Sequence, residues 1–358
     1  MNKIPIYKPY LDYNEKNLVM DCMESTWISS KGSYIKKFED SVKNYTKANY
    51  CSAISNGTNA LHLAFLALDI NQGDEVITTN YTYVASTNAI LYVGAKPVFC
   101  EINREDLNID VSKIEEKITS KTKAILYTNV YGFLCNYDKL KKIASKYGLY
   151  LIEDGAESFG ASYKNKMSGT LGDISTFSFF GNKTITTGEG GMVLCNNKKH
   201  YNKIIQLKNQ GNSKKTYFHD VLGYNYRMTN IQAAIGFAQM NKIDEIIFLK
   251  KKIYDKYKQL LKGDVKFLEK LKNTNPSFWM TPIVFKTKRQ KEKVVKKLQK
   301  NNIETRPFFT PIDSLPFYKK SNCNIAKEIF ELGILLPSYP GLSSKNQIKI
   351  CKLITTTL

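Results

Sequence analysis

Lys183 stands in a setting that could give a lysine amine a chemical role. It lies between the apolar run FSFF at 177–180 and the polar stretch TITTGEGG at 184–191. The runs STFSFF and GMVLC on either side read as strands, so the simplest interpretation is a hairpin with a glycine-rich turn. Such a turn would be unusually long and rich in threonine. An amine held there could instead form a Schiff base with a carbonyl compound.

Two other stretches place polar groups directly after apolar runs. In ISNGTNALHLAF, a strand is expected to end at Ser55 and a helix to begin near Thr58, so backbone N–H groups exposed by Gly57 could bind an anion. In YLIEDGAESFGA, an apolar strand ends at Asp154, and Glu157 follows. A carboxylate there could hold a metal, orient a base or pair with a cationic ring nitrogen. Ordinary helix caps are the alternative interpretation of both stretches.

A pair of tyrosines, Tyr81 and Tyr83, follows the expected strand DEVITT. Their rings could stack on a flat cofactor, although the chain has 23 Tyr and core packing is the simpler interpretation of either one alone. An anion site, an aromatic ring, a carboxylate and a lysine thus follow successive strands. This combination suits pyridoxal 5′-phosphate (PLP), whose phosphate, ring, pyridinium nitrogen and aldehyde each need one such partner. The sequence therefore predicts a PLP site.

These side chains must be positioned by a sheet. From about residue 45 to 200, β-rich runs such as DEVITT, KPVFCEI and KAILYTN alternate with helical patterns such as YVASTNAILYV and YDKLKKIASKYG. A further helix is expected near VSKIEEKI. The alternation predicts an α/β fold with a largely parallel sheet and helices on both faces. In such sheets, ligands bind at the carboxyl ends of the strands.

The sequence changes character after about residue 240. A long lysine-rich helix is expected over MNKIDEIIFLKKKIYDKYKQLLK. The strand candidate FWMTPIVFK, the helix candidate QKEKVVKKLQKNN and the segment IETRPFFTPIDSLPFY follow. We therefore expect a large domain at residues 1–240, which holds the cofactor, and a smaller C-terminal α/β domain at residues 241–358.

The composition excludes several other classes of protein. A net charge of +21 could indicate a nucleic-acid-binding protein, but most of the excess is lysine in helical stretches, and no RNA-binding motif occurs. No apolar run reaches the roughly 18 residues of a membrane helix. The seven Cys occur singly without a CxxC and there are three His, so we expect neither a disulfide framework nor a metal site. The chain reads as a cytoplasmic protein without nucleic-acid or membrane partners.

The chain resembles the DegT/DnrJ/EryC1/StrS family of sugar aminotransferases over nearly its whole length. The matching stretches are STWISSKGSYIKKFE, SNGTNALHLA, GDEVI, IEDGAESFGA, GTLGDISTFSFFGNKTITTGEGGMV, HDVLGYNYRMTNIQAAIG and ETRPFF. The stretch FSFFGNKTITTGEGGM is the most specific of them. The resemblance implies PLP-dependent transferase fold type I, the aspartate aminotransferase-like fold. That fold has a large domain with a mostly parallel central sheet and a smaller C-terminal α/β domain.

The resemblance also implies a role for each matching residue. Lys183 corresponds to the Schiff-base lysine and Asp154 to the partner of the pyridine nitrogen. The other cofactor-binding positions are the ring-stacking Tyr83, Glu157 near the phenolic oxygen, the phosphate-binding Gly57, Thr58 and Ser178, and Asn225. In the family, the asparagine at this last position reaches the phosphate in the neighbouring subunit. A homodimer with shared active sites follows from that position.

The reaction implied is transfer of an amino group from an amino acid, expected to be L-glutamate, to the keto group of a nucleotide-linked 4-keto-6-deoxy sugar. Its product would serve capsule or lipopolysaccharide synthesis. Some proteins of this fold are PLP dehydratases, but these usually have histidine where this chain has Lys183. The expected contacts to substrate are Trp27, Ser29, Lys31, Asn129, Arg306 and Asp313.

Two of these positions depart from the family. Asn129 and Asp313 both stand where relatives usually have histidine. A carboxylate facing the acceptor would repel a pyrophosphate. The alternatives are therefore drift at positions that touch no substrate, or a changed acceptor such as dihydroxyacetone phosphate, a small phosphorylated ketone. Arg306 could bind an anion in either case.

Overall fold

A seven-stranded sheet forms the centre of the protein in the computed structural model, which describes residues 3–358. Its strands, in spatial order, are β1 (Tyr50–Ile54), β9 (Gly191–Cys195), β8 (Ile174–Ser178), β5 (Tyr150–Asp154), β4 (Thr122–Thr128), β2 (Glu75–Thr79) and β3 (Lys96–Cys100). Only β9 runs against the others, because it pairs antiparallel with both β1 and β8. The sheet is therefore mostly parallel, as the sequence predicts.

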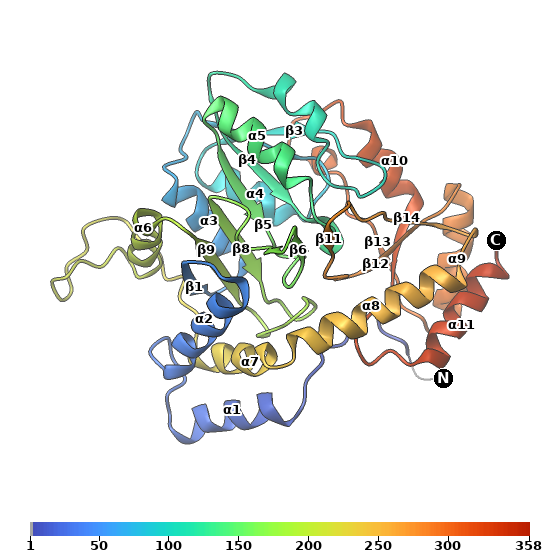
Figure 1. Ribbon diagram of the computed structural model, residues 1–358, viewed down its shortest axis with the longest axis horizontal. Helices are drawn as coiled ribbons and strands as arrows, with labels where there is room; N and C mark the ends of the chain where they lie inside the picture. The colour runs from blue at the N-terminus through green and yellow to red at the C-terminus, as the bar shows by residue number, and fades with distance from the viewer. Residues whose placement is uncertain (1–2) are drawn as a thin grey trace.

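Helices cover both faces of this sheet (Figure 1). One face packs against α3 (Gly57–Ala67), α4 (Val84–Tyr92) and α6 (Lys198–Lys208). The other packs against α2 (Ser33–Thr46), α5 (Tyr137–Tyr147) and α7 (Asn230–Met240), and α1 (Tyr13–Glu24) lies beside α7. Neighbouring residues of one strand enter opposite cores: Leu151 packs with α5, and Ile152 packs with α3. This alternation is why each strand reads as a continuous apolar run.

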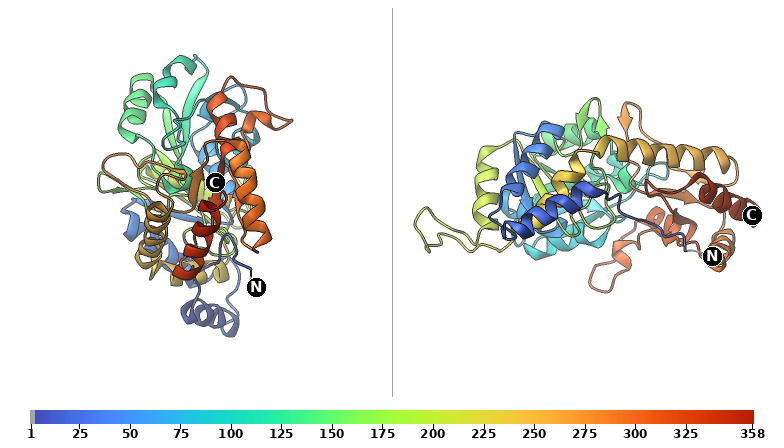
Figure 2. Two further views of the ribbon diagram at one scale, coloured as in Figure 1. Left: turned by 90° about the vertical axis from the view of Figure 1, so that its right-hand side faces the viewer. Right: turned by 90° about the horizontal axis from the view of Figure 1, so that it is seen from below.

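The C-terminal part has its own sheet and core. The 18-residue helix α8 (Ile243–Leu260) leads into it. Its four antiparallel strands are ordered β10 (Lys266–Phe267), β12 (Thr281–Val284), β14 (Gly333–Leu336) and β13 (Arg306–Pro307). The helices that cover it are α9 (Lys288–Lys300), α10 (Asn324–Leu332) and α11 (Ser344–Thr355). Figure 2 shows these helices at the end of the molecule opposite α6.

Two features connect this part to the large sheet. A small sheet pairs β11 (Thr274–Asn275) with β6 (Ser162–Tyr163), which also pairs with β7 (Lys166–Met167). The N-terminal residues Ile4 and Ile6 pack in the C-terminal core. The predicted boundary at residue 240 falls between α7 and α8 and stays a prediction. By packing, however, the first residues of the chain belong with its last third.

One expected helix takes another form. The segment VSKIEEKI folds as two 3₁₀ turns, Val111–Lys113 and Glu115–Lys117. Its buried residues Val111 and Ile114 are three apart, and side chains at that spacing eclipse each other in a 3₁₀ helix. Further 3₁₀ turns are Val130–Gly132 and Ile312–Ser314. Within residues 3–358, no helix combines the length and apolarity needed to cross a lipid bilayer.

Candidate active site

A cavity of about 630 Å³ opens at the carboxyl ends of the central strands and is closed on one side by residues of the C-terminal part. Eight of the predicted site residues line it: Gly57, Thr58, Tyr83, Asp154, Glu157, Ser178, Lys183 and Arg306. They come from the ends of β1, β2, β5 and β8 and from β13. This is the place where a parallel sheet offers a binding site.

Lys183 lies on the loop at 179–190 that joins β8 to β9, so the simple hairpin interpretation is right about the topology. The threonines of this loop hold it in shape: Thr186 donates from Oγ1 to the carbonyl of Phe179 at 3.1 Å. The hydroxyl of Tyr7 donates to the Lys183 carbonyl at 2.5 Å. The long, threonine-rich connection is therefore a structured platform for one lysine.

The Lys183 amine faces two carboxylates and an aromatic ring. Its Nζ lies 4.0 Å from the centroid of the Trp279 ring. Burial lowers the pKa of Lys183, and the charges of Glu157 and Asp154 oppose that shift without cancelling it. The neutral amine is therefore more populated than in water, and the neutral form is the one that attacks a carbonyl.

Asp154 and Glu157 are both buried, with exposed fractions of 3% and 2%. Asp154 accepts hydrogen bonds from the Ser86 hydroxyl at 2.5 Å and from the Ala156 N–H at 3.1 Å. Glu157 accepts from the Tyr131 N–H at 2.6 Å. Burial raises the pKa of Asp154 and raises that of Glu157 to about 7. A cationic ring nitrogen beside Asp154 would stabilise its charged form.

The start of α3 forms an anion cradle. Asn56 caps the helix by accepting from the Asn59 N–H at 2.8 Å, and the N–H groups of Gly57 and Thr58 before it have no acceptor within the helix. A Cβ added to Gly57 would lie only 2.8 Å from the Cβ of Ser178, so glycine is required for this close approach. Backbone N–H groups and two hydroxyls thus converge, as a phosphate needs.

The two tyrosines after β2 have different roles. Tyr83 is 58% exposed at the cavity, where a ring could stack on it. Tyr81 is fully buried and shares a 2.8 Å hydrogen bond with the hydroxyl of Tyr131. Core packing therefore accounts for Tyr81, but it does not account for Tyr83.

These observations fit PLP. The phosphate would lie against Gly57, Thr58 and Ser178, and the ring would lie between Tyr83 and Asp154 within reach of Lys183. The cavity also contains the buried Oδ1 of Asn182, which lacks a hydrogen-bond partner among residues 3–358. No set of three or more His, Cys, Asp or Glu suited to a metal is found in that same range.

The other predicted contacts lie outside the described lining of the cavity. Trp27, Ser29 and Lys31 are exposed on the connection between α1 and α2. Asn225 is also exposed, and its Oδ1 accepts from the Arg227 side chain at 3.1 and 2.8 Å. A single chain therefore does not bring these four residues to its own cofactor site.

The expectation that Asn129 touches the acceptor needs correction. Its side chain is 1% exposed, donates to Glu153 at 3.0 Å and to Ser158 at 3.1 Å, and accepts from the Cys135 N–H. These bonds use its amide to fix the backbone after β4. Asn129 therefore supports the fold at this point and does not line the cavity.

The same correction applies to Asp313, whose side chain is fully buried. It accepts from the Asn80 amide at 3.1 Å and from the Ser321 N–H and hydroxyl at 2.9 Å, and it pairs with Lys327 at 3.2 Å. Burial acts to raise its pKa, but these partners together outweigh burial and lower the pKa. Its charge is neutralised where it stands, and the described lining of the cavity does not include it.

Several residues that line the cavity are not predicted from the sequence. The ones with a clear contact are Ser86, Asn182, Trp279 and Phe309. Trp279 donates from its indole N–H to the Asn182 carbonyl at 2.7 Å, and Phe309 packs beside Tyr83. A serine facing the β5 carboxylate has no distinctive local motif. The sequence feature that could have drawn attention to Trp279 is the rarity of tryptophan, since the chain has two Trp.

The fold and the site define a PLP-dependent enzyme of fold type I. The chain belongs to the DegT/DnrJ/EryC1/StrS aminotransferase family, whose model matches residues 9–355. It is therefore a PLP-dependent aminotransferase.

Relatives agree with this assignment. The chain is 48% identical to GDP-perosamine synthase of Escherichia coli O157:H7, covering 99% of this chain and 98% of that protein. It is 45% identical to GDP-perosamine synthase of Vibrio cholerae, covering 98% of both. Among solved structures, the PLP form of the putative sugar aminotransferase Spr1654 from Streptococcus pneumoniae superimposes with a TM-score of 0.94. It is 26% identical and covers 99% of this chain and 98% of that chain.

Proposed function

We propose that this aminotransferase moves an amino group from L-glutamate to the keto carbon of a GDP-linked 4-keto-6-deoxy sugar, for surface polysaccharide synthesis. The observation that carries the proposal is the 48% and 45% identity to two GDP-perosamine synthases over nearly the full length of the chain. The cavity supports the PLP chemistry of this proposal, because its lining includes Thr58, Asp154 and Lys183, whereas Asn225 lies outside that lining.

The chain's own residues would divide the work as follows. Bound PLP supplies an electron sink next to the reacting carbon. Lys183 Nζ would hold PLP in the resting enzyme, and as a free amine it would accept the proton from the donor's amino-bearing carbon. Asp154 would keep the ring nitrogen of bound PLP protonated, because a buried carboxylate favours a neighbouring positive charge. Trp279 and Phe309 exclude water from this face, and Arg306 beside them binds an anionic group of donor or acceptor.

The main reason for considering a small phosphorylated ketone as the acceptor does not hold. It depended on a carboxylate at position 313 that faces the substrate and repels a pyrophosphate. Asp313 is buried and paired with Lys327, so this repulsion does not reach the cavity. A nucleotide-linked sugar is therefore the better supported acceptor.

We also propose a homodimer in which Asn225 completes the partner's phosphate site. The segment at 209–229 between α6 and α7 carries Asn225 and extends from the body at the left of Figure 1. Apolar side chains exposed on this segment are Tyr217, Phe218, Val221 and Leu222, which a second subunit could cover. Mixing inactive Lys183→Ala and Asn225→Asp dimers tests the arrangement, because a mixed dimer contains one intact site. Activity that stays absent after subunit exchange would contradict it.

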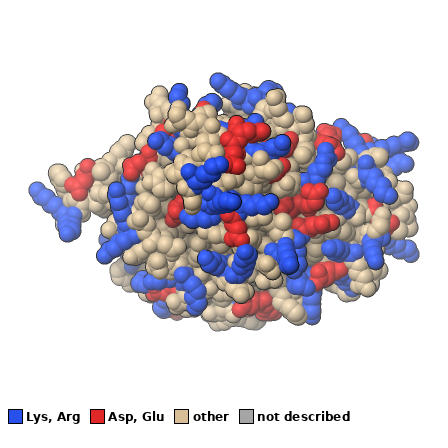
Figure 3. Space-filling view, turned by 45° about the horizontal axis from the view of Figure 1, so that its top comes forward, with Lys and Arg blue, Asp and Glu red and all other residues tan. Residues whose placement is uncertain are grey.

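Nucleic-acid binding has little support from the surface. Over the face drawn in Figure 3, Lys and Arg are scattered with Asp and Glu between them and do not form one continuous patch. Such a distribution is typical of solvated helix faces. We place the enzyme in the cytoplasm, which its seven free, buried cysteines support. Salt-dependent binding to random DNA at submicromolar protein would revive the rival function.

The decisive experiment loads the enzyme with pyridoxamine phosphate and offers ketones separately. We expect GDP-4-keto-6-deoxymannose to restore the visible absorption of the PLP form. A UDP- or dTDP-linked 4-keto sugar and dihydroxyacetone phosphate serve as matched comparisons. Restoration by dihydroxyacetone phosphate alone would overturn the proposed acceptor, and restoration by none of the three would overturn the sugar class as a whole.

A further inference from the structure

A second lysine, Lys250 in α8, lies buried close to the residues that surround Lys183. It is 1% exposed, and its Nζ donates to the carbonyl of Trp279 at 2.9 Å and to the carbonyl of Ser338 at 3.1 Å. The same Nζ lies 5.0 Å from the centroid of the Tyr7 ring. Within residues 3–358, its hydrogen bonds go only to carbonyl oxygens, and no carboxylate forms an ion pair with it.

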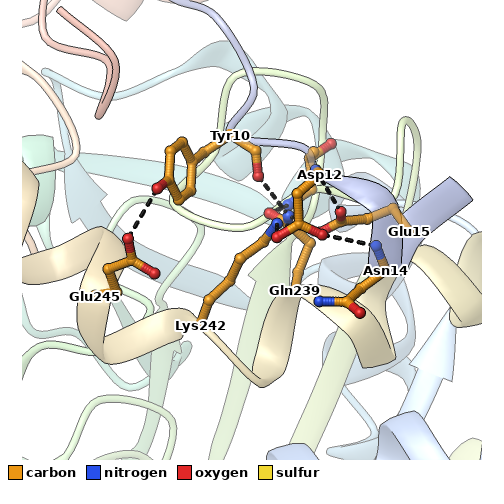
Figure 4. Close-up of polar contacts among 8 residues, drawn as sticks. Tyr10, Asp12, Asn14, Glu15, Gln239, Lys242 and Glu245 are labelled. Atoms are coloured by element: carbon orange, nitrogen blue, oxygen red, sulfur yellow. Dashed lines mark hydrogen bonds and ion pairs between the residues drawn. The ribbon is translucent and has the colours of Figure 1, made fainter.

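Lys242 is a second buried lysine of this region, and it has charged partners. It is 9% exposed, and its Nζ pairs with Asp12 at 2.9 Å and with Glu15 at 2.7 Å (Figure 4). These carboxylates begin α1, so the pairs fasten α1 to the junction of α7 and α8. Lys242 also lies 5.3 Å from the ring of Tyr10, much as Lys250 lies near Tyr7. The two lysines therefore differ in their partners: Lys242 pairs with carboxylates, and Lys250 donates to backbone carbonyls.

Both aromatic neighbours of Lys250 touch the Lys183 loop. The Trp279 ring lies 4.0 Å from Lys183 Nζ, and its indole N–H donates to the Asn182 carbonyl. The Tyr7 hydroxyl donates to the Lys183 carbonyl. Lys250 also contacts the backbone at or near each of these residues. Its Nζ donates to the Trp279 carbonyl and to the Ser338 carbonyl. The Ser338 N–H in turn donates at 3.3 Å to the carbonyl of Ile6, the residue before Tyr7.

We propose that Lys250 is a positioning residue for Lys183, and that its amine fixes Trp279 and Tyr7 so that they hold the Lys183 loop in place. The catalytic role of the Lys183 loop rests on the proposed function, whereas the contacts of Lys250 are independent of it. Burying a lysine is costly, and methionine would fill most of the same volume at lower cost. The amine supplies what methionine lacks, namely two N–H donors for two carbonyls that come from different segments.

Tryptophan fluorescence can test this without catalysis, because the chain has only two Trp. A Trp27→Phe background leaves Trp279 as the single reporter in the cofactor-free protein. We expect Lys250→Met in this background to shift the Trp279 emission to longer wavelength and to increase its quenching by acrylamide. Lys242→Met is the matched control, and we expect it to leave both readouts unchanged. Circular dichroism and thermal unfolding show that each variant is folded under the conditions used.

The holoenzyme gives the second readout. We expect Lys250→Met to lower kcat by about 10- to 100-fold, the order expected when a catalytic group is displaced by about an ångström, with little change in the donor KM. Lys250→Arg, which keeps its donors, should recover part of that loss. Unchanged quenching in Lys250→Met, or the same change in Lys242→Met, overturns the proposal. Absence of transamination by the wild-type protein would instead overturn the proposed function and leave the fluorescence comparison valid.

Discussion

The two walls of the cavity are built in different ways. The sheet wall consists of groups at the ends of central strands: Gly57, Asp154, Glu157, Ser178 and Lys183. The C-terminal wall consists of residues from the second sheet and its connections: Trp279, Arg306 and Phe309. The first wall is polar and carries the charges that a cofactor needs. The second is mainly aromatic and closes the site from the side.

The two walls also differ in the sequence separation between the residues that contact each other. In the sheet wall, each side chain lies within a few residues of the strand that delivers it, as Asp154 does at the end of β5. In the C-terminal wall, Trp279 contacts Asn182, which lies 97 residues earlier in the chain, and behind this wall Tyr7 packs against the C-terminal core and donates to the Lys183 carbonyl. Local sequence therefore determines the chemistry of the site, and tertiary packing determines its enclosure. The variants below separate these two contributions.

The largest effect is expected from Lys183→Ala in the sheet wall. Loss of the amine removes both the covalent anchor of the cofactor and the proton carrier, so kcat should fall by about 10³-fold or more. The measurement is glutamate-dependent amino transfer at saturating PLP. Borohydride treatment of the wild type, followed by peptide mapping, should find the cofactor on Lys183. Near-normal turnover by Lys183→Ala would remove the central role of this lysine.

Asp154→Asn should have the next largest effect. Asparagine keeps the size of the side chain but cannot stabilise a protonated ring nitrogen, so kcat should fall by about 10²- to 10³-fold. PLP methylated at the ring nitrogen carries a fixed positive charge and should restore part of the activity of this variant. If the methylated cofactor gives no rescue, Asp154 has another role.

Glu157 is expected to affect stability through pH. Burial raises its pKa from 4.5 to about 7, so between these values the folded chain holds a proton that the unfolded chain has released. The stability of the cofactor-free protein should therefore fall as pH rises through this window, by at most about 3 kcal/mol. Denaturant unfolding at pH 5 and pH 8 measures this, with Glu157→Gln as the variant that should lose less stability. Equal pH dependence in both proteins would assign the effect to other groups.

The sheet wall can be predicted from the sequence for a physical reason. Strands such as DEVITT and YLIED are buried on both faces, so they appear as apolar runs whose ends can be read directly. The antiparallel β8–β9 pair is also visible as a hairpin. The same reasoning could not find Ser86 or Phe309, because their importance depends on contacts across the fold.

The errors at Asn129 and Asp313 have a related cause. Both positions are candidates for substrate contact because relatives usually have histidine there, and drift at positions that touch no substrate is the alternative. Their partners show that each polar group is used inside the protein, by Glu153 and Ser158 in one case and by Asn80, Ser321 and Lys327 in the other. A sequence gives the type of a side chain but does not give the direction in which it points.

In the C-terminal wall, Trp279→Phe should have a moderate effect. Phenylalanine keeps a ring near Lys183 but loses the indole N–H that binds the Asn182 carbonyl. Loss of a hydrogen bond worth about 1 kcal/mol predicts a decrease in kcat of about 5- to 10-fold. Single-turnover kinetics with glutamate measures the chemical step directly. A decrease as large as that of Lys183→Ala would mean that the two walls are not separable.

Asp313→Asn should change catalysis least, because its carboxylate lies outside both walls. The substitution removes the charge that pairs with Lys327 and weakens the hydrogen bonds from Asn80 and Ser321, so we expect a loss of about 1–2 kcal/mol in unfolding free energy. The loop that follows Phe309 is held by these bonds, yet the acceptor never meets the carboxylate. The KM for the nucleotide sugar and the preference over dihydroxyacetone phosphate should therefore stay as in the wild type. A changed preference between the nucleotide sugar and dihydroxyacetone phosphate, without a loss of stability, would place Asp313 in contact with the acceptor. It would then support an acceptor selected by the charge of Asp313, which the burial of this carboxylate argues against.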